Sequence, residues 1–186
     1  LQKMNRRHDA SQAIGAIQNA AKIGFNNISV DLIYGLPGLT ETEWKDSLNQ
    51  VFDLPVQHLS AYHLTYHEGT AFYTWLKKGT LRELSETESV NQFEILIDKA
   101  ASAGFEQYEI SNFARNELYS QHNTSYWQGK KYLGLGPSAH SFDQQSRRWN
   151  TSHVESYIKA IDNELAFSEE EILSEKDRYN EYILTR

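Results

Sequence analysis

The sequence contains no cysteine, so it can form neither disulfide bonds nor thiolate metal sites within its 186 residues. It also lacks any apolar run near the ~20 residues that a membrane span requires, and nothing in it resembles a signal peptide. Positive charge is scarce, because 18 Lys and Arg stand against 25 Asp and Glu and the net charge is −7. A general nucleic-acid binder presents a basic face. We therefore expect a cytoplasmic protein that neither crosses a membrane nor binds nucleic acid.

The sequence does contain enough hydrophobic residues for a core, 39%, and many aromatic ones, including 11 Tyr and 4 Trp. Its clearest local pattern lies in residues 26–44. Apolar and polar side chains alternate over residues 28–32, which predicts a β-strand. The Gly-Leu-Pro-Gly of residues 35–38 then ends the strand in a tight turn. Thr40 and Glu43 have the spacing of a capping box, which starts a helix.

Asp31 is the polar residue of interest in this strand, because it lies among apolar neighbours near the expected C-terminal end. A carboxylate in such surroundings is costly unless it is paired. Ligands bind at this end of the strands in α/β folds, which favours a binding residue. The alternative is a structural Asp that caps the amides of the turn. The residues alone leave both interpretations open.

Similar patterns through the first two thirds of the chain predict an α/β fold. A second strand at 58–65 follows the helix at 40–50, and a strand, a helix and a strand in this length form a right-handed unit with parallel strands. We also expect helices at 9–23, 71–78 and 85–103, and a third strand at 106–111.

The chain loses this periodicity beyond residue 112. The glycine-rich residues 132–137 do not have the spacing of a phosphate-binding loop. The later pattern predicts a hairpin from residues 139–142 and 147–150, a helix from residue 152, a solvated acidic run at 169–171 and a last helix from Ser174. We place a domain boundary between about residues 150 and 165.

The seven His residues do not show the H-E-x-x-H spacing of a helical zinc site. His58 and His63 fall in the second expected strand, where half-buried structural residues are common. His122 opens a polar and aromatic segment. On its own it has the character of a surface His that hydrogen-bonds Asn123 or Ser125.

Several short motifs become specific when they are taken together and in order. They are Arg6-Arg7-His8, Asp31-Leu32-Ile33-Tyr34-Gly35-Leu36-Pro37-Gly38, Ser60-Ala61-Tyr62, Glu68-Gly69-Thr70, Tyr108-Glu109-Ile110-Ser111-Asn112-Phe113-Ala114, His122-Asn123-Thr124-Ser125-Tyr126-Trp127 and Gly134-Leu135-Gly136-Pro137-Ser138-Ala139-His140-Ser141. With them the chain resembles, over nearly its whole length, the radical S-adenosylmethionine (SAM) proteins related to oxygen-independent coproporphyrinogen III oxidase. The His-Asn-x-x-Tyr-Trp stretch makes it most similar to the haem chaperone branch of that family, the HemW-like proteins.

The resemblance implies a partial TIM-type barrel that holds a [4Fe–4S] cluster and SAM, followed by a mainly helical C-terminal domain. The family holds its cluster with a C-x-x-x-C-x-x-C motif early in the barrel, and this chain has no Cys. We therefore expect residues 1–150 to be the C-terminal half of the barrel with a haem-binding loop region. Residues 151–186 would begin the C-terminal domain, and this chain alone would be unable to start radical chemistry.

The same resemblance implies SAM-binding roles for Arg6, Asp31 and Thr65. A guanidinium such as that of Arg6 can hold a carboxylate through two hydrogen bonds, which suits the methionine end of SAM. The carboxylate of Asp31 suits ribose hydroxyls or an ammonium group. Thr65 matches a position that contacts the cofactor through its backbone. The resemblance thus favours the binding interpretation of Asp31 over the structural one.

For the segment that begins at His122, the resemblance implies haem binding. An imidazole is a common ligand of haem iron, so His122 is the expected metal ligand. The aromatic rings of Tyr126 and Trp127 suit the face of a porphyrin, and Asn123 belongs to the same motif.

We therefore expect a radical SAM-type protein that binds haem and delivers it to client haemoproteins. The alternative is an enzyme, oxygen-independent coproporphyrinogen III oxidase, which converts two propionate side chains to vinyl groups in haem synthesis. A third interpretation is a barrel fragment that acts on some other sugar or nucleotide.

Overall fold

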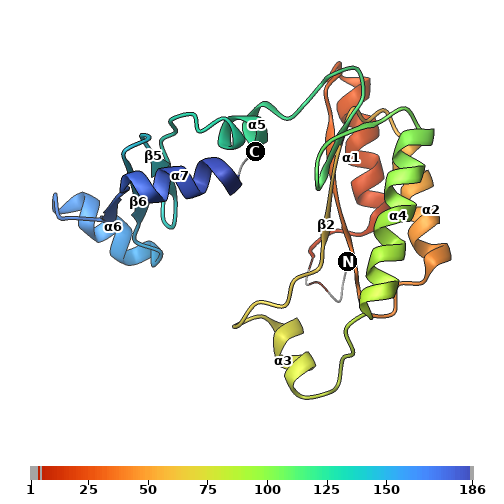
Figure 1. The fold of residues 1–186 in the computed structure, drawn as a ribbon, viewed down its shortest axis with the longest axis horizontal. Coiled ribbons are helices and arrows are strands. Elements are labelled where there is room, and N and C mark those ends of the chain that lie inside the picture. The colour runs from red at the N-terminus through yellow and green to blue at the C-terminus, as the bar shows by residue number, and fades with distance from the viewer. Residues whose placement is uncertain (1–3, 5, 185–186) are drawn as a thin grey trace. The chain divides into compact units, whose positions relative to one another are not determined.

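The computed structural model describes residue 4 and residues 6–184 of the chain. It divides into two compact units, Leu1–Tyr119 and Ser120–Arg186 (Figure 1). The expected division between about residues 150 and 165 falls inside the second unit, where the strand that ends at Asn150 pairs with a strand that begins at Ser168. The assignment of residues 1–150 to the family's barrel stays a prediction.

The first unit is a four-stranded sheet covered by helices on one face. Its strands follow the order β1-β2-β4-β3, in which β1 and β2 are parallel and the other neighbours are antiparallel. The parallel pair joined by a helix confirms the expected α/β class. The elements are α1 (Ala10–Lys22), β1 (Ser29–Tyr34), α2 (Glu41–Phe52), β2 (His58–His63), α3 (Ala71–Lys77), α4 (Glu86–Ser102), β3 (Glu106–Glu109) and β4 (Asn112–Ala114).

Local signals in the sequence set the ends of these helices. Thr40 accepts a hydrogen bond from the amide of Glu43, and the side chain of Glu43 bonds the amide of Thr40 in return, which confirms the expected capping box. Ser85 and Glu88 form a second one at the start of α4. The strand β4 was not expected, because its three residues are too few to show a periodicity.

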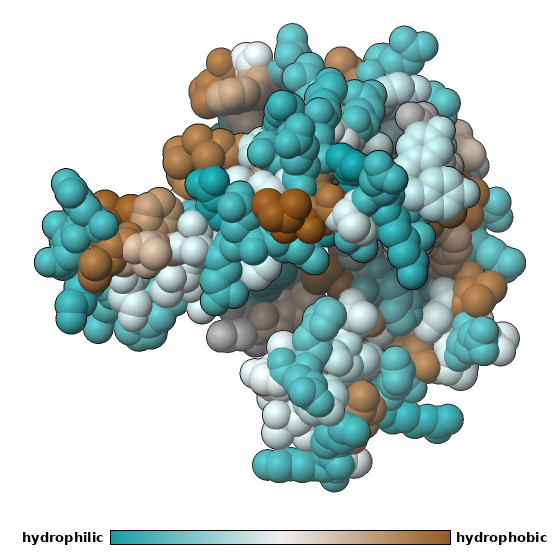
Figure 2. All heavy atoms as spheres, turned by 60° about the vertical axis from the view of Figure 1, so that its left-hand side comes forward, coloured by the Kyte–Doolittle hydropathy of each residue, from teal (hydrophilic) through white to brown (hydrophobic). Residues whose placement is uncertain are grey.

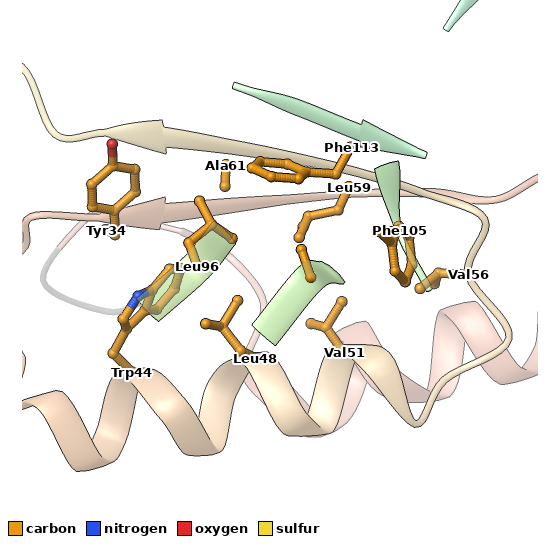
Figure 3. Packing of buried hydrophobic residues seen from close by; sticks show 11 residues of the cluster. Tyr34, Trp44, Leu48, Val51, Val56, Leu59, Ala61, Leu96, Phe105 and Phe113 are labelled. Atoms are coloured by element: carbon orange, nitrogen blue, oxygen red, sulfur yellow. The ribbon is translucent and has the colours of Figure 1, made fainter. Parts of the chain in front are cut away.

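The core of the first unit lies between the sheet and the helices α2 and α4 (Figure 3). Trp44, Leu48 and Val51 point from α2 into this core, as their spacing predicts. Leu96 lies opposite them on α4, and Leu59 closes the core from β2. The helices thereby fix the apolar face of the sheet, and the other face is free to carry polar side chains.

The second unit contains a three-stranded antiparallel sheet, β5-β6-β7. The expected hairpin is confirmed, since β5 pairs with β6. The prediction for residues 169–171 needs a correction. Glu169–Glu171 are exposed, as expected for a solvated acidic run, but they also form part of the strand β7. Its glutamates face the basic and aromatic residues of β6, and this non-local pairing leaves no pattern in its own sequence. The elements are α5 (Gln121–Trp127), β5 (His140–Phe142), β6 (Ser146–Asn150), α6 (Val154–Asp162), β7 (Ser168–Ile172) and α7 (Glu175–Leu184).

Within the described residues, no helix combines the length and the apolar character that crossing a membrane demands.

Candidate functional site

The polar face of the first unit's sheet is the first candidate site. Asp31 of β1 lies opposite Ser60 of β2, and Ser60 lies opposite Asn112 of β4. Side chains of residues paired in this way lie on the same face of a sheet. Ser60 and Asn112 are buried, whereas Asp31 is exposed. The three strands therefore present a row of one carboxylate, one hydroxyl and one amide on the face opposite the apolar core.

Asp31 is the third of six residues in β1, so it lies in the middle of the strand rather than at its C-terminal end. It does not cap the turn, because the amide of Gly35 donates instead to Oε1 of Gln92 at 2.9 Å. The structural interpretation of Asp31 as the turn's cap is therefore wrong. Its exposed carboxylate on a polar face fits a ligand that offers hydroxyl or ammonium groups.

Gln92 is a buried residue whose role was not predicted from the sequence. Its side-chain amide accepts from Gly35 and donates to the carbonyl of Leu39 at 3.1 Å. Its backbone carbonyl accepts from the indole Nε1 of Trp44 at 2.8 Å. Gln92 thus fixes both ends of the turn that follows β1. The sequence marks this role only in that Gln92 is a polar residue one helical turn before Leu96, on the buried stripe of α4.

His58 joins three strands on the polar face. Its Nδ1 is hydrogen-bonded to Ser29 Oγ at 2.8 Å, and its Nε2 to the hydroxyl of Tyr108 at 2.7 Å. Burial lowers the pKa of His58, and the nearby carboxylate of Asp31 partly opposes that shift. A neutral imidazole with both nitrogens engaged is a structural residue, which confirms its expected character.

Arg6 and Thr65 are both exposed, Arg6 before α1 and Thr65 two residues beyond the end of β2. Among the described residues no hydrogen bond or ion pair joins either of them to Asp31. Their expected SAM contacts stay predictions.

The second candidate site surrounds α5 in the second unit. The side chain of Ser120 caps this helix by accepting from the amide of Asn123. His122 and Tyr126 lie one turn apart on the same side of the helix, and their rings meet edge to face with centroids 4.9 Å apart. The hydroxyl of Ser125 donates to the carbonyl of Gln121 and not to His122. His122 remains exposed, with its ring oriented by Tyr126.

Further aromatic rings continue from Tyr126 into a cavity. Its ring meets that of Tyr132 at 4.9 Å, and Tyr132 meets Phe142 at 5.9 Å. Together with Trp127 these three residues line a cavity of about 400 Å³, which we call the aromatic pocket. That volume lies within the usual range for small-molecule sites. Burial raises the pKa of Tyr132, so its hydroxyl stays protonated at neutral pH.

The donor set of this site fits a haem. His122 offers an exposed imidazole that could ligate iron, and the half-exposed rings of Tyr126 and Trp127 offer apolar faces for a flat macrocycle. A [4Fe–4S] cluster does not fit this chain, because the chain has no cysteine. In the described part of the chain, no group of three or more His, Asp or Glu residues is placed to hold a metal ion.

The known proteins with similar sequences indicate one family. The haem chaperone HemW of Bacillus subtilis is 37% identical over 161 residues, which covers 87% of this chain and 42% of HemW. The HemW of Lactococcus lactis is 34% identical over 181 residues, or 97% of this chain and 48% of that protein. The mitochondrial radical S-adenosyl methionine domain-containing protein 1 of Mus musculus is 38% identical over 140 residues, covering 75% of this chain and 32% of the relative. No model of a protein family matches the chain.

The fold has a solved counterpart in the coproporphyrinogen III oxidase HemN of Escherichia coli, described as a radical SAM enzyme. The TM-score is 0.77 at 20% sequence identity, and the match covers 97% of this chain and 44% of HemN. The chain thus has a radical SAM fold of the HemN type. It belongs to the HemW-like branch of that family. It spans about half the length of the curated relatives that it matches.

Proposed function

We propose that the complete protein binds haem at His122 and delivers it to target haemoproteins in the cytoplasm. The observation that carries this proposal is the exposed imidazole of His122, oriented by Tyr126 beside the aromatic pocket. The comparisons support it, because the HemW relatives are named as haem chaperones. An exposed ligand suits delivery, because the haem must leave the site for another protein.

We propose further that SAM binds on the polar face of the sheet. The exposed carboxylate of Asp31 would accept hydrogen bonds from SAM. Arg6 would bind the carboxylate of SAM, and Thr65 would contact SAM through its backbone. When bound to a family member, the cluster supplies electrons to SAM. This chain has no cysteine for a cluster, so the chain alone should not cleave SAM.

The haem proposal is tested with His122→Ala in the complete protein, and with His67→Ala as the matched control at an exposed His of the first unit. We expect His122→Ala to shift the Soret band and to weaken haem binding, with the circular dichroism spectrum unchanged. The His67→Ala protein should bind haem as the parent does. Identical spectra and affinities in parent and His122→Ala would show that His122 is not the ligand.

The rival function is oxygen-independent coproporphyrinogen III oxidase, which the fold of HemN suggests. Incubating the complete protein with coproporphyrinogen under anaerobic, reducing conditions distinguishes this function from haem delivery. We expect no conversion. Formation of the vinyl product would replace the haem-delivery proposal by the oxidase function.

A further inference from the structure

We infer that Arg147 and Arg178 form the carboxylate anchor of the aromatic pocket, so that the site selects a tetrapyrrole with free acid side chains. This inference rests on the proposed haem function and deepens it. Haem carries two propionate carboxylates along one edge of an otherwise apolar ring. A pocket that recognises it therefore needs apolar walls and cations together.

The aromatic pocket has that combination. Its lining includes Tyr126, Tyr132 and Phe142, together with Arg147 from β6 and Arg178 from α7. The two guanidinium groups thus come from elements that are distant in sequence and meet at one cavity of about 400 Å³. The chain carries a net charge of −7, so its general field repels anions. The two arginines at the aromatic pocket place positive charge there, in contrast to the negative net charge of the chain.

The guanidinium of Arg147 is held in place from two sides. Its Nη2 forms an ion pair with Oε1 of Glu181 at 2.6 Å, and its Cζ lies 5.9 Å from the centroid of the Phe142 ring. A guanidinium has five N–H donors in a planar fork, so the ion pair leaves donors for a ligand. An arginine that is already oriented loses less entropy when it binds a carboxylate.

Arg178 is exposed, and it forms no ion pair with any carboxylate in the part of the chain that the structure describes. The carboxylate of Glu181, which also lines the pocket from α7, pairs with Arg147 instead. Arginine binds carboxylates through two parallel hydrogen bonds. Arg178 is the primary anchor for one propionate, and Arg147 is the second.

The test compares haemin with haemin dimethyl ester, in which both carboxylates are capped, by Soret titration of the complete protein. We expect the parent to bind the ester about a hundredfold more weakly, equivalent to about 2.8 kcal/mol. Arg178→Gln and Arg147→Gln should each weaken haemin binding about tenfold and leave ester binding unchanged. The double variant with both substitutions should bind haemin and its dimethyl ester equally.

Two control variants remove a positive charge from the same elements without touching the pocket. The first is Arg148→Gln. Arg148 follows Arg147 in β6, so its side chain points to the opposite face of the sheet, where it pairs with Glu170. Lys176→Gln lies on α7 two residues before Arg178. Both should keep the parent's preference for the acid. A preference lost equally in these controls would indicate a general charge effect and overturn the inference.

Glu181→Gln separates ligand binding from folding, because it breaks the ion pair of Arg147 but keeps the guanidinium. We expect haemin to bind as tightly as in the parent, or more tightly, because the Gln amide oxygen can still accept a hydrogen bond from Arg147 while a negative charge is removed from the pocket. Weakening as large as that of Arg147→Gln would show that Arg147 acts through the fold, and would overturn its role as an anchor.

The remaining outcomes distinguish this inference from the proposed function. If the double variant still prefers the acid while His122→Ala weakens haem binding, the anchor is wrong and the haem site stands. If the parent binds neither haemin nor its ester, both proposals fail.

Discussion

The two units of the chain differ most in how much apolar surface they bury. In the first unit, eleven buried residues form one continuous hydrophobic cluster between the sheet and two helices. Among the described residues of the second unit, the buried hydrophobic ones are Ala160 and Leu173. The second unit is instead held by strand pairing, by the contacts between its aromatic rings and by ion pairs such as that of Arg147 with Glu181.

This difference explains where each unit can carry a ligand. The core of the first unit fixes one face of its sheet, so the polar face with Asp31 is a rigid surface. The second unit leaves apolar side chains exposed, among them Val154, Ile158 and Ile161 on α6. Figure 2 shows hydrophobic residues at the surface among hydrophilic ones. A site built from exposed aromatic rings can admit and release a large flat ligand.

The largest expected effect follows from the core. Leu96→Ala should lower the free energy of unfolding by about 2–5 kcal/mol, because a fully buried Leu leaves a cavity. Ile158→Ala in the second unit, where the side chain is 52% exposed, should change it by less than about 0.5 kcal/mol. Chemical denaturation of both variants measures the contrast. Equal losses would mean that the two units do not differ in packing as described.

A second contrast lies inside the turn of the first unit. Gly35 has a φ of +73°, and a Cβ there would overlap with the imidazole ring of His63. Gly35→Ala should cost about 1–2 kcal/mol for the backbone and about 1–3 kcal/mol more for the overlap. Gly38→Ala shares the positive φ but has no atom within 4 Å, so it should pay only the backbone cost. Thermal melts of the two variants separate these terms.

Gln92→Leu tests the buried amide that fixes this turn. It leaves the amide of Gly35 and the carbonyl of Leu39 without their partner, which should cost about 1–3 kcal/mol. The matched control is Gln50→Leu, the same substitution at an exposed position of α2. If both variants unfold at the same denaturant concentration, Gln92 does not hold the turn.

The smallest effect should come from the pH dependence of His58. Its pKa is lowered in the folded state, so unfolding takes up a proton between the lowered pKa and the ordinary value of about 6.5. The contribution of His58 to stability is therefore complete above about pH 6.5, and it is lost as the pH falls toward the lowered pKa. Stability curves of the parent and His58→Gln should diverge in that direction only. Parallel curves between pH 8 and 5 would contradict the buried, neutral imidazole.

The sequence predicted those features whose signals are local. The capping box of Thr40 and Glu43 and the spacing of Trp44 and Leu48 depend on neighbours within a few residues, and the structure confirms them. The strand β7 and the role of Gln92 depend on partners far along the chain. The local sequence shows only that Gln92 is a polar residue on the buried stripe of α4, and it does not show which groups the side chain bonds.

The candidate sites divide in the same way. The sequence singled out the residue types at Asp31 and His122 but could not show which faces they occupy. Asp31 proved to be exposed on a polar face because strand register, a non-local property, places it opposite Ser60. The aromatic pocket was missed as a cavity, because Tyr132, Phe142 and Arg147 join Tyr126 only through the fold.

The acidic sequence of β7 has a consequence for how copies of this protein meet. β7 is an edge strand, and an edge strand presents unpaired backbone groups that can recruit a strand from another molecule. Three consecutive glutamates, Glu169–Glu171, occupy that edge. A second copy approaching edge to edge would bring six carboxylates together, so like-charge repulsion protects the strand from intermolecular sheet formation.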